Sequence, residues 1–324
     1  MAGAIVFERT GGPDVLQWAD VRVGEPGAGQ VRVRHEAVGL NFADTYFRTG
    51  LYPAPLPSGM GVEASGVIEE VGADVTDFAP GDRVTYTGSP LGAYSTERVM
   101  PTDSLIHLPD AITAETAAAM TMRGLTAAYL IRRIAPGLGA GDTVLLQAAA
   151  GGVGLIVCQW ARLLGINVIG VVSTPEKGEI ALAHGATEVL VGRDNVAQRV
   201  RDLTDGKGVP VVFDSVGAAT FESSLDAVAR RGLLVCFGTA SGPIPHIDAM
   251  QLAIKGSIYV TRPALADYIA DPAERAELAG ELFQHVAAGD VRIEVGQRFP
   301  LRDAARAHEA LESGTSIGSS VLTV

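Results

Sequence analysis

Small residues between positions 148 and 154 have the spacing of a turn that holds a dinucleotide. The turn reads Ala149-x-Gly151-x-x-Gly154, which is a G-x-G-x-x-G pattern with alanine at its first position. Glycine at 151 lets the backbone approach a pyrophosphate, and Gly154 lets the next helix pack closely on the preceding strand. The unpaired N–H groups at the start of that helix attract an anion. We expect the cofactor to be bound here by Ala149, Gly151, Gly152, Val153 and Gly154.

The elements on either side of the turn support this interpretation. Thr143–Gln147 is a short apolar run typical of a strand buried on both faces, and another buried strand begins near Val168. From Leu155 onward apolar residues recur at helical spacing, and Gly165 is placed to end the helix. A small-residue turn alone also serves ordinary strand–helix packing, so the flanking pattern carries the argument.

The rest of the chain is organised around this unit. Before about residue 108 the pattern is that of antiparallel strands, expected at 4–7, 16–23, 30–38 and 58–72. A helix follows from Thr113, and then strands and helices alternate in the manner of one parallel sheet covered on both faces, with a sixth strand at 258–260. We predict an α/β protein in which residues 124–261 form the dinucleotide-binding domain. Residues 1–123 and 262–324 form the second domain, because the tail is too short to fold alone and returns to the first strands.

Composition excludes several classes of protein. The chain has 324 residues, 47% of them hydrophobic, with 39 glycines, and no apolar run is long enough to cross a bilayer. We expect a soluble, cytoplasmic protein, since the first residues do not form a secretory signal. A formal net charge of −12 opposes general binding to nucleic acid or an anionic membrane. The two cysteines, Cys158 and Cys236, lie in apolar segments and predict neither a disulfide framework nor a zinc site.

Several segments together resemble the zinc-free branch of the medium-chain dehydrogenase/reductase superfamily, and within it the NADPH:quinone oxidoreductases related to zeta-crystallin. The segments that carry this resemblance are 41–53, 81–84, 148–154, 214–217 and 259–263. The resemblance covers nearly the whole chain and implies a Rossmann domain joined to a GroES-like, β-rich catalytic domain. Zinc enzymes of the superfamily have a cysteine ligand where Asn41 stands and a histidine where Val62 precedes Glu63. No metal is therefore expected, and a substrate that accepts hydride readily fits better than an alcohol.

The resemblance also implies which residues meet substrate. It places the nicotinamide and the substrate in the cleft between the domains, beside Asn41, Asp44, Tyr46 and Tyr52, with Tyr46 able to bond a quinone oxygen and with Phe42 and Thr45 contacting the cofactor. Helix capping by Asn41 and Asp44, and aromatic packing of the tyrosines, would explain the same residues without a catalytic role. Arg262 steers a quinone or phosphate in one interpretation and anchors a loop in the other.

Cofactor preference depends on the end of the strand near Val168. NAD-binding folds place a carboxylate there, whereas this chain has Ser173 and then Lys177, which can pair with a 2′-phosphate. A solvated lysine is the simpler alternative. Relatives also use a tyrosine and a late arginine, and Gly192 and Gly314 stand at those places, with Arg193 adjacent, so the NADPH preference is expected to be weaker than usual. Further cofactor contacts implied by the resemblance are Tyr129, Val216, Gly238, Thr239, Ala240 and Ser241.

The function expected from these observations is NADPH-dependent reduction of a quinone without a metal. The alternatives are reduction of a 2-alkenal or enone, and a nucleotide-linked RNA-binding protein, which the acidic composition disfavours. We also expect a homodimer, because the sixth strand is a candidate sheet edge that relatives pair across a two-fold axis.

Overall fold

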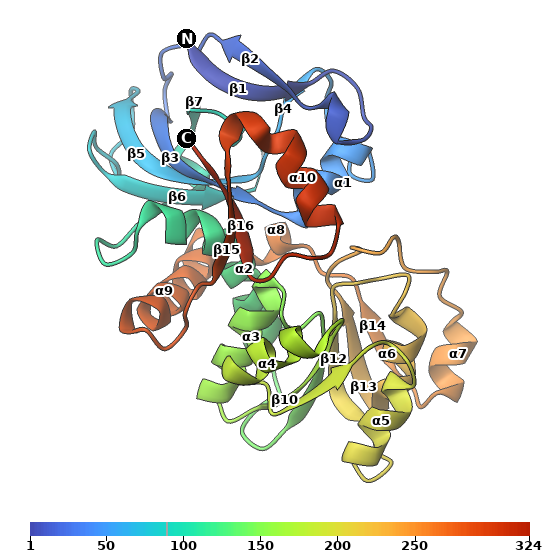
Figure 1. The fold of residues 1–324 in the computed structure, drawn as a ribbon. Coiled ribbons are helices and arrows are strands. Elements are labelled where there is room, and N and C mark those ends of the chain that lie inside the picture. The colour runs from blue at the N-terminus through green and yellow to red at the C-terminus, as the bar shows by residue number, and fades with distance from the viewer. Residues whose placement is uncertain (89) are drawn as a thin grey trace. The chain divides into compact units, whose positions relative to one another are not determined.

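The computed structural model describes residues 1–88 and 90–324, and its chain divides into two compact units (Figure 1). Unit 1 contains Met1–Leu125, Arg275–Ala287 and Ile293–Val324, and unit 2 contains Thr126–Glu274 and Ala288–Arg292. The sequence analysis assigned 262–274 to the first domain, whereas the structure groups this segment with unit 2. A contact within unit 2 accounts for this grouping, because Tyr268 stacks on Tyr129 with ring centroids 4.3 Å apart.

Unit 2 contains a six-stranded sheet in the order β11-β10-β9-β12-β13-β14, in which all neighbouring strands are parallel. This confirms the expected doubly wound sheet, whose order reverses at β9 and β12. Hydrophobic residues such as Leu145, Ile169 and Phe221 are buried at its core. The strands are β9 Thr143–Gln147, β10 Asn167–Val172, β11 Glu188–Val191, β12 Val209–Asp214, β13 Val228–Cys236 and β14 Tyr259–Thr261.

The helices of unit 2 alternate with these strands. Helix α3 begins at Gly152, three residues earlier than the apolar pattern indicated, and β13 begins five residues before its expected start at Leu233. Two short helices, α7 and α8, had no periodic signal in the sequence. The helices are α3 Gly152–Leu163, α4 Pro175–Ala183, α5 Val196–Leu203, α6 Phe221–Ala227, α7 Ala249–Ile254 and α8 Leu265–Tyr268.

Unit 1 is built on two sheets. One has the order β2-β1-β4, and the other has the order β15-β16-β3-β5-β6-β8, with β7 also paired to β3. Residues such as Val33, Tyr86 and Leu322 form its core. The strands are β1 Ala2–Phe7, β2 Gln17–Val21, β3 Gln30–Leu40, β4 Ser58–Gly59, β5 Glu63–Val71, β6 Arg83–Thr87, β7 Glu97–Pro101, β8 Leu105–His107, β15 Val295–Pro300 and β16 Ser319–Thr323.

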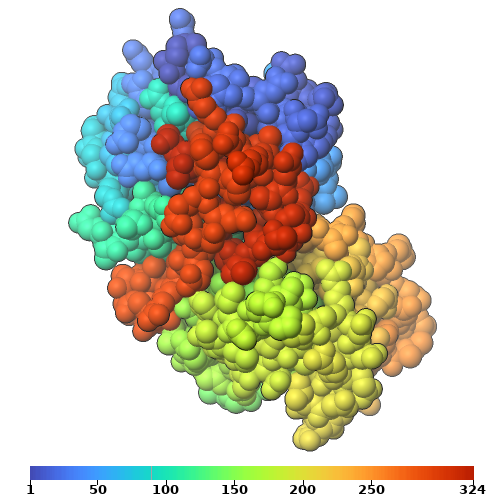
Figure 2. Space-filling view, in the orientation of Figure 1, coloured from blue at the N-terminus to red at the C-terminus, as the bar shows by residue number. Residues whose placement is uncertain are grey.

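The tail returns to the first strands, as the sequence predicted. Strand β16 runs antiparallel to β3, with Ser320 opposite Leu40, and the tail forms part of the surface of unit 1, coloured red in Figure 2. The antiparallel pattern expected before about residue 108 does not extend to the tail, since β15 and β16 are parallel and are joined through α10. The helices of this unit and of the crossings between units are α1 Phe42–Thr49, α2 Ala114–Arg132, α9 Pro272–Ala288 and α10 Ala304–Glu312. Short 3-10 turns occupy Pro13–Val15, Thr102–Ser104 and Leu301–Asp303.

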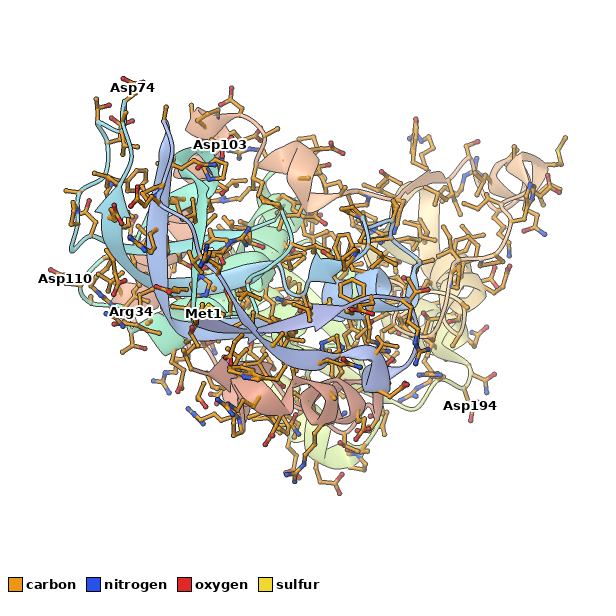
Figure 3. All side chains as sticks on the ribbon, turned by 90° about the horizontal axis from the view of Figure 1, so that it is seen from above. Met1, Arg34, Asp74, Asp103, Asp110 and Asp194 are labelled. Atoms are coloured by element: carbon orange, nitrogen blue, oxygen red, sulfur yellow. The ribbon has the colours of Figure 1, made fainter. Side chains whose placement is uncertain are left out.

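The surface carries the acidic excess. Asp74, Asp103, Asp110 and Asp194 are exposed, and Figure 3 shows their side chains pointing away from the ribbon. Within the described ranges no helix is long and apolar enough to span a membrane.

Candidate functional site

The glycine turn of unit 2 connects β9 to α3. A Cβ atom added at Gly154 would lie 2.5 Å from the carbonyl oxygen of Ala148 and 2.6 Å from that of Ala149, so only glycine allows this close helix–strand contact. The alanine at the first position of the pattern is accommodated by a second glycine. A Cβ atom at Gly170 in β10 would lie 2.7 Å from the Ala149 methyl, which means that Gly170 leaves the space that Ala149 fills.

The start of α3 suits an anion. Gly151 is the N-cap and provides no side-chain acceptor for the first helical N–H groups. Gly151, Gly152 and Val153 are all partly exposed, and the helix is 12 residues long, so its partial positive charge is available at this end. The geometry of the turn therefore fits the pyrophosphate of a dinucleotide.

A buried aspartate organises the loop after β12, next to the glycine turn in the sheet. Asp214 Oδ1 accepts hydrogen bonds from the backbone N–H of Val216 (2.8 Å) and Gly217 (3.1 Å), and Oδ2 accepts from the hydroxyls of Thr220 (2.8 Å) and Ser224 (2.7 Å). These bonds fix the backbone at the carboxyl end of the strand, where ligands of parallel sheets bind.

The loop after β13 lies against this one. Ser241 Oγ donates to the carbonyl oxygen of Val216 at 2.8 Å, and the Ser241 N–H donates to the same oxygen at 2.7 Å. A Cβ atom at Gly238 would lie 2.5 Å from the carbonyl oxygen of Ser215. The structure thus brings together the residues expected after the two strands, which are Val216, Gly238, Thr239, Ala240 and Ser241.

The end of β10 presents the groups expected to meet a 2′-phosphate. Ser173 is exposed, and Thr174 caps α4 by accepting a hydrogen bond from the Lys177 N–H at 3.3 Å. Partial burial lowers the pKa of the Lys177 ammonium. In the adjacent strand, Gly192 donates from its N–H to the carbonyl oxygen of Val172, and a Cβ atom on Gly192 would meet no atom within 4 Å. The space beside the strand ends is therefore open.

The remaining residues suggested for the cofactor or substrate in unit 2 have defined contacts. Arg193 is exposed beside Gly192. The Tyr129 side chain is only 2% exposed and stacks on Tyr268, so a cofactor contact from it is an edge contact at most. Arg262 follows β14 and donates to the carbonyl oxygen of Pro263 at 2.8 Å, which is the loop-anchoring contact of its simpler interpretation. Gly314 belongs to unit 1 and follows α10.

In unit 1 the segment from Asn41 forms α1, and Asn41 is its N-cap. The backbone N–H of Asn41 donates to Asp44 Oδ2 at 2.8 Å, and the Thr45 hydroxyl donates to the carbonyl oxygen of Phe42 at 2.7 Å. Asp44 is 0% exposed, so it cannot touch a substrate in this structure. The contact with the Asn41 N–H is the one expected from the capping role that the sequence also allowed.

Tyr46 and Tyr52 form an aromatic pair. Their ring centroids are 5.2 Å apart with the planes at 70°, and Phe47 extends the cluster from the other side of Tyr52. Tyr46 is 8% exposed and Tyr52 is half-buried. Edge-to-face packing of this kind fixes ring orientation.

A buried cluster of charges lies behind Asn41. The Asn41 Nδ2 group donates to Glu63 Oε2 at 2.7 Å, and the Met122 N–H donates to Glu63 Oε1 at 2.6 Å. Arg123 is buried and donates to the carbonyl oxygens of Ala119 and Leu40. Burial raises the pKa of Glu63 and of Asp44 to about 7, against the opposing charge of Arg123.

Sequence reasoning did not assign Glu63 or Arg123 to the site. The signal for Glu63 was an acidic residue inside the apolar run at the start of β5, and Arg123 stands alone as a charge in the middle of α2. Asn41 and Glu63 bond to each other, and the apolar Val62 precedes the glutamate, so this donor set is not one that zinc prefers. Among the described residues no three His, Cys, Asp or Glu side chains are placed to hold a metal ion.

Two family models match the chain. Residues 27–110 match the alcohol dehydrogenase GroES-like domain, and residues 152–276 match the zinc-binding dehydrogenase domain. A quinone oxidoreductase of Pseudomonas aeruginosa is 53% identical over 324 residues, with 99% of each chain covered. The crystal structure of Escherichia coli quinone oxidoreductase complexed with NADPH has a TM-score of 0.97 at 45% identity, covering 99% of this chain and 100% of that one. A 2-haloacrylate reductase of Burkholderia sp. is 44% identical, again over 99% of each chain.

Proposed function

Since the chain belongs to the zinc-free quinone oxidoreductases of the medium-chain dehydrogenase/reductase superfamily, we propose that it catalyses the NADPH-dependent reduction of quinones. The observation that carries this proposal is the 53% identity to a quinone oxidoreductase over the full length, together with a glycine turn whose geometry fits a dinucleotide. Reduction of electron-poor alkenes is represented by the 2-haloacrylate reductase, at lower identity. Quinone reduction is therefore the better-supported activity.

NADPH is held, in this proposal, by the carboxyl end of the parallel sheet. The start of α3 takes the pyrophosphate, Val216 and residues 238–241 line the path of the nicotinamide half, and Lys177 with Ser173 and Arg193 takes the 2′-phosphate. Phe42 and Thr45 add contacts from unit 1. When bound, NADPH supplies the two reducing equivalents of the reaction.

The substrate side is formed, in this proposal, by Tyr46, Tyr52 and Asn41. The tyrosine pair offers an aromatic surface for a quinone ring, and the Tyr46 hydroxyl donates a hydrogen bond to a quinone oxygen. Arg262 adds a positive charge that attracts the electron-rich oxygens of the substrate. Asp44 acts as a positioning residue, because it holds the N-terminus of α1 from a fully buried position.

We also propose that the protein is a cytoplasmic homodimer. Free, buried cysteines suit a reducing compartment. Strand β14 lies at the edge of its sheet, and it and the preceding α7 expose Tyr259, Ile254 and Met250 at 65%, 78% and 64%. Unpaired edges with exposed apolar side chains are commonly covered by a second subunit.

The activity is tested by following NADPH oxidation at 340 nm with 1,2-naphthoquinone and, separately, with a 2-alkenal, each repeated with NADH. We expect faster quinone turnover than alkenal turnover, and a higher kcat/KM with NADPH than with NADH. Turnover of the alkenal alone would keep the cofactor site and overturn the quinone assignment. Tight binding of an AU-rich RNA at physiological salt, without turnover of either substrate, would overturn the assignment as an enzyme.

The phosphate assignment is tested in the same assay with Lys177→Ala. A charge-assisted hydrogen bond to phosphate contributes about 1–2 kcal/mol, so the KM for NADPH should rise about 5- to 30-fold while the KM for NADH stays within twofold. Lys207→Ala is the matched control, because this lysine is in the same unit and its side chain is 78% exposed. Equal changes for both cofactors would remove Lys177 from the phosphate site.

A further inference from the structure

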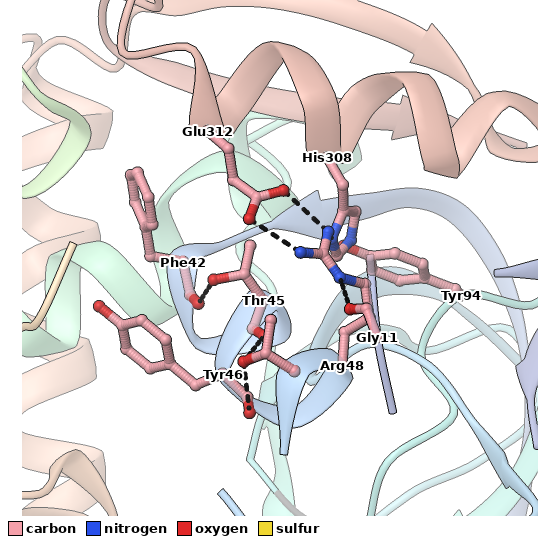
Figure 4. A network of polar contacts seen from close by, with 9 residues as sticks. Gly11, Phe42, Thr45, Tyr46, Arg48, Tyr94, His308 and Glu312 are labelled. Carbon is pink, nitrogen blue, oxygen red and sulfur yellow. Dashed lines mark hydrogen bonds and ion pairs between the residues drawn. The ribbon is translucent and has the colours of Figure 1, made fainter. Parts of the chain in front are cut away.

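A hydrogen-bonded chain connects the C-terminal helix α10 to the helix that carries Tyr46 (Figure 4). Arg48 in α1 forms two bonds with the carboxylate of Glu312, at 2.9 and 2.8 Å, and a third with His308 Nδ1 at 3.1 Å. His308 Nε2 lies 3.1 Å from the Tyr94 hydroxyl, which in turn donates to Asp44 Oδ2 at 2.9 Å. Residues 260 positions apart in the chain are thus in direct contact.

These hydrogen bonds all run in one direction, from Arg48 through His308 and Tyr94 to Asp44. Arginine can only donate, so His308 accepts at Nδ1 and its proton is on Nε2, from which it donates to the Tyr94 oxygen. Tyr94 then donates to Asp44, which also accepts the N–H of Asn41. Burial and the positive charge of Arg48 lower the pKa of His308 to about 3, in keeping with a neutral ring. The donor and the acceptor of each of these hydrogen bonds are therefore fixed. Reversing any one bond would leave a buried donor or acceptor without a partner.

The contacts hold both ends of α1. Asp44 fixes the first turn through the Asn41 N–H, and Arg48 fixes the last turn through Glu312 and through the carbonyl oxygen of Gly11, at 3.1 Å. Asp44 and Arg48 are four residues apart and share one face of the helix. Tyr46 is two residues from each, about 200° around the helix axis, and Figure 4 shows its ring directed away from Arg48. The network therefore sets the rotation of α1 without touching the face that carries Tyr46.

We propose that α10, through His308, Tyr94 and Asp44, positions the substrate-binding helix and so determines how tightly the enzyme holds its quinone. The proposal rests on the proposed function, because it takes Tyr46 as part of the quinone site. His308, Tyr94 and Glu312 are positioning residues, since none of them reaches the substrate side of α1.

Tyr94→Phe tests the proposal with the smallest possible change. It removes one oxygen atom, which leaves the Nε2–H of His308 without an acceptor and removes a donor from Asp44. The expected result is a rise of about five- to tenfold in the KM for 1,2-naphthoquinone, with the KM for NADPH within twofold of the wild type. The KM for NADPH separates a shift of α1 from general damage, because most of the proposed NADPH contacts, the glycine turn among them, belong to unit 2 and only Phe42 and Thr45 lie on α1.

Tyr86→Phe is the matched control. Tyr86 is 1% exposed in the core of the same unit, and its hydroxyl lies 3.0 Å from Nε2 of another buried histidine, His35. It lies in β6, and within the described residues its hydroxyl bonds to His35 and not to α1, so the control should lose stability to a similar extent without raising the KM for quinone. A second variant, Glu312→Gln, removes the charge and keeps only one of the two bonds to Arg48, because the amide nitrogen cannot accept from the guanidinium; it should raise the same KM about two- to threefold.

The outcomes distinguish a failure of the proposed function from a failure of the positioning role of α10. A wild-type protein without quinone turnover contradicts the proposed function. A wild-type protein that is active, with Tyr94→Phe and Tyr86→Phe giving the same KM for quinone, leaves the function standing and overturns the positioning role of α10.

Discussion

Burial shifts the pKa values of four titratable side chains in unit 1, upward for two carboxyl groups and downward for two histidines. Burial raises the pKa of Asp44 and Glu63 to about 7, and it lowers that of His35 to about 4 and of His308 to about 3. In each case the neutral form is favoured. Three of these four groups are tied to α1 or its cap: Asp44 lies in the helix, Glu63 accepts a hydrogen bond from the N-cap Asn41, and His308 bonds to Arg48.

The two kinds of group act on stability with opposite sign. For the carboxyls the folded state binds more protons than the unfolded state between about pH 4 and 7, so their contribution to the free energy of unfolding falls as pH rises through this range. For the histidines the unfolded state binds more protons between about pH 4 and 6.5, so their contribution rises with pH. The two slopes offset each other in the wild type.

Replacement of Asp44 tests how much of the pH dependence of stability comes from its carboxyl group. Asp44→Asn is destabilising because the cap is weakened, but the variant no longer loses stability by ionising residue 44. The difference in unfolding free energy between wild type and variant should therefore be largest at about pH 4 and shrink toward pH 7. Urea unfolding at four pH values measures it, with the exposed Asp74→Asn as control. A difference that grows from pH 5 to pH 7 would mean that Asp44 is ionised in the folded protein well below pH 7.

At the scale of elements, the turn between β9 and α3 is the most constrained part of unit 2. Gly154→Ala should destabilise the protein by about 2–4 kcal/mol, since the added methyl meets two carbonyl oxygens at 2.5 and 2.6 Å. It should also weaken NADPH binding, because the helix start has to move away from the strand. Thermal unfolding and a fluorescence titration with NADPH measure the two effects.

Gly280→Ala is the matched control for that substitution. Gly280 lies inside α9, and a Cβ atom there would meet no atom within 4 Å. Alanine is the better helix former, so this variant should gain about 0.5–1 kcal/mol and bind NADPH unchanged. Equal destabilisation by both substitutions would show that close packing at the turn is not the reason for glycine at 154.

These contrasts also show which elements a sequence can predict. The strands and helices of unit 2 alternate with clear periods, and strand β9 has the bounds Thr143–Gln147 that the apolar run predicted. Helices α7 and α8 are six and four residues long, which is too short for a period to appear. The parallel pairing of β15 with β16 depends on the return of the chain around α10, and no local pattern encodes it.

The residues of the candidate site also differ in how far the sequence predicts them. Residues proposed to bind the cofactor through backbone geometry, such as Gly151 and Gly154, follow from a motif that is contiguous in sequence. The partners of Asn41 and Asp44 do not, because Glu63, Arg123, Tyr94 and His308 come from four separate segments that only the fold brings together. A buried charge inside an apolar run was the one sequence signal that these residues gave.

At the scale of the whole molecule, the exposed edge of unit 2 makes the assembly testable. Light scattering should give about twice the chain mass of 33.6 kDa at micromolar concentration. Tyr259→Lys adds a charge to the edge strand and should shift the protein toward monomer, because a charged, desolvated edge opposes pairing. Leu203→Lys is the control, since Leu203 is 49% exposed on α5 of the same unit, away from β14 in the order of the sheet. A wild-type monomer would contradict the dimer, and a dimer that survives Tyr259→Lys but not Leu203→Lys would move the interface to the surface around α5.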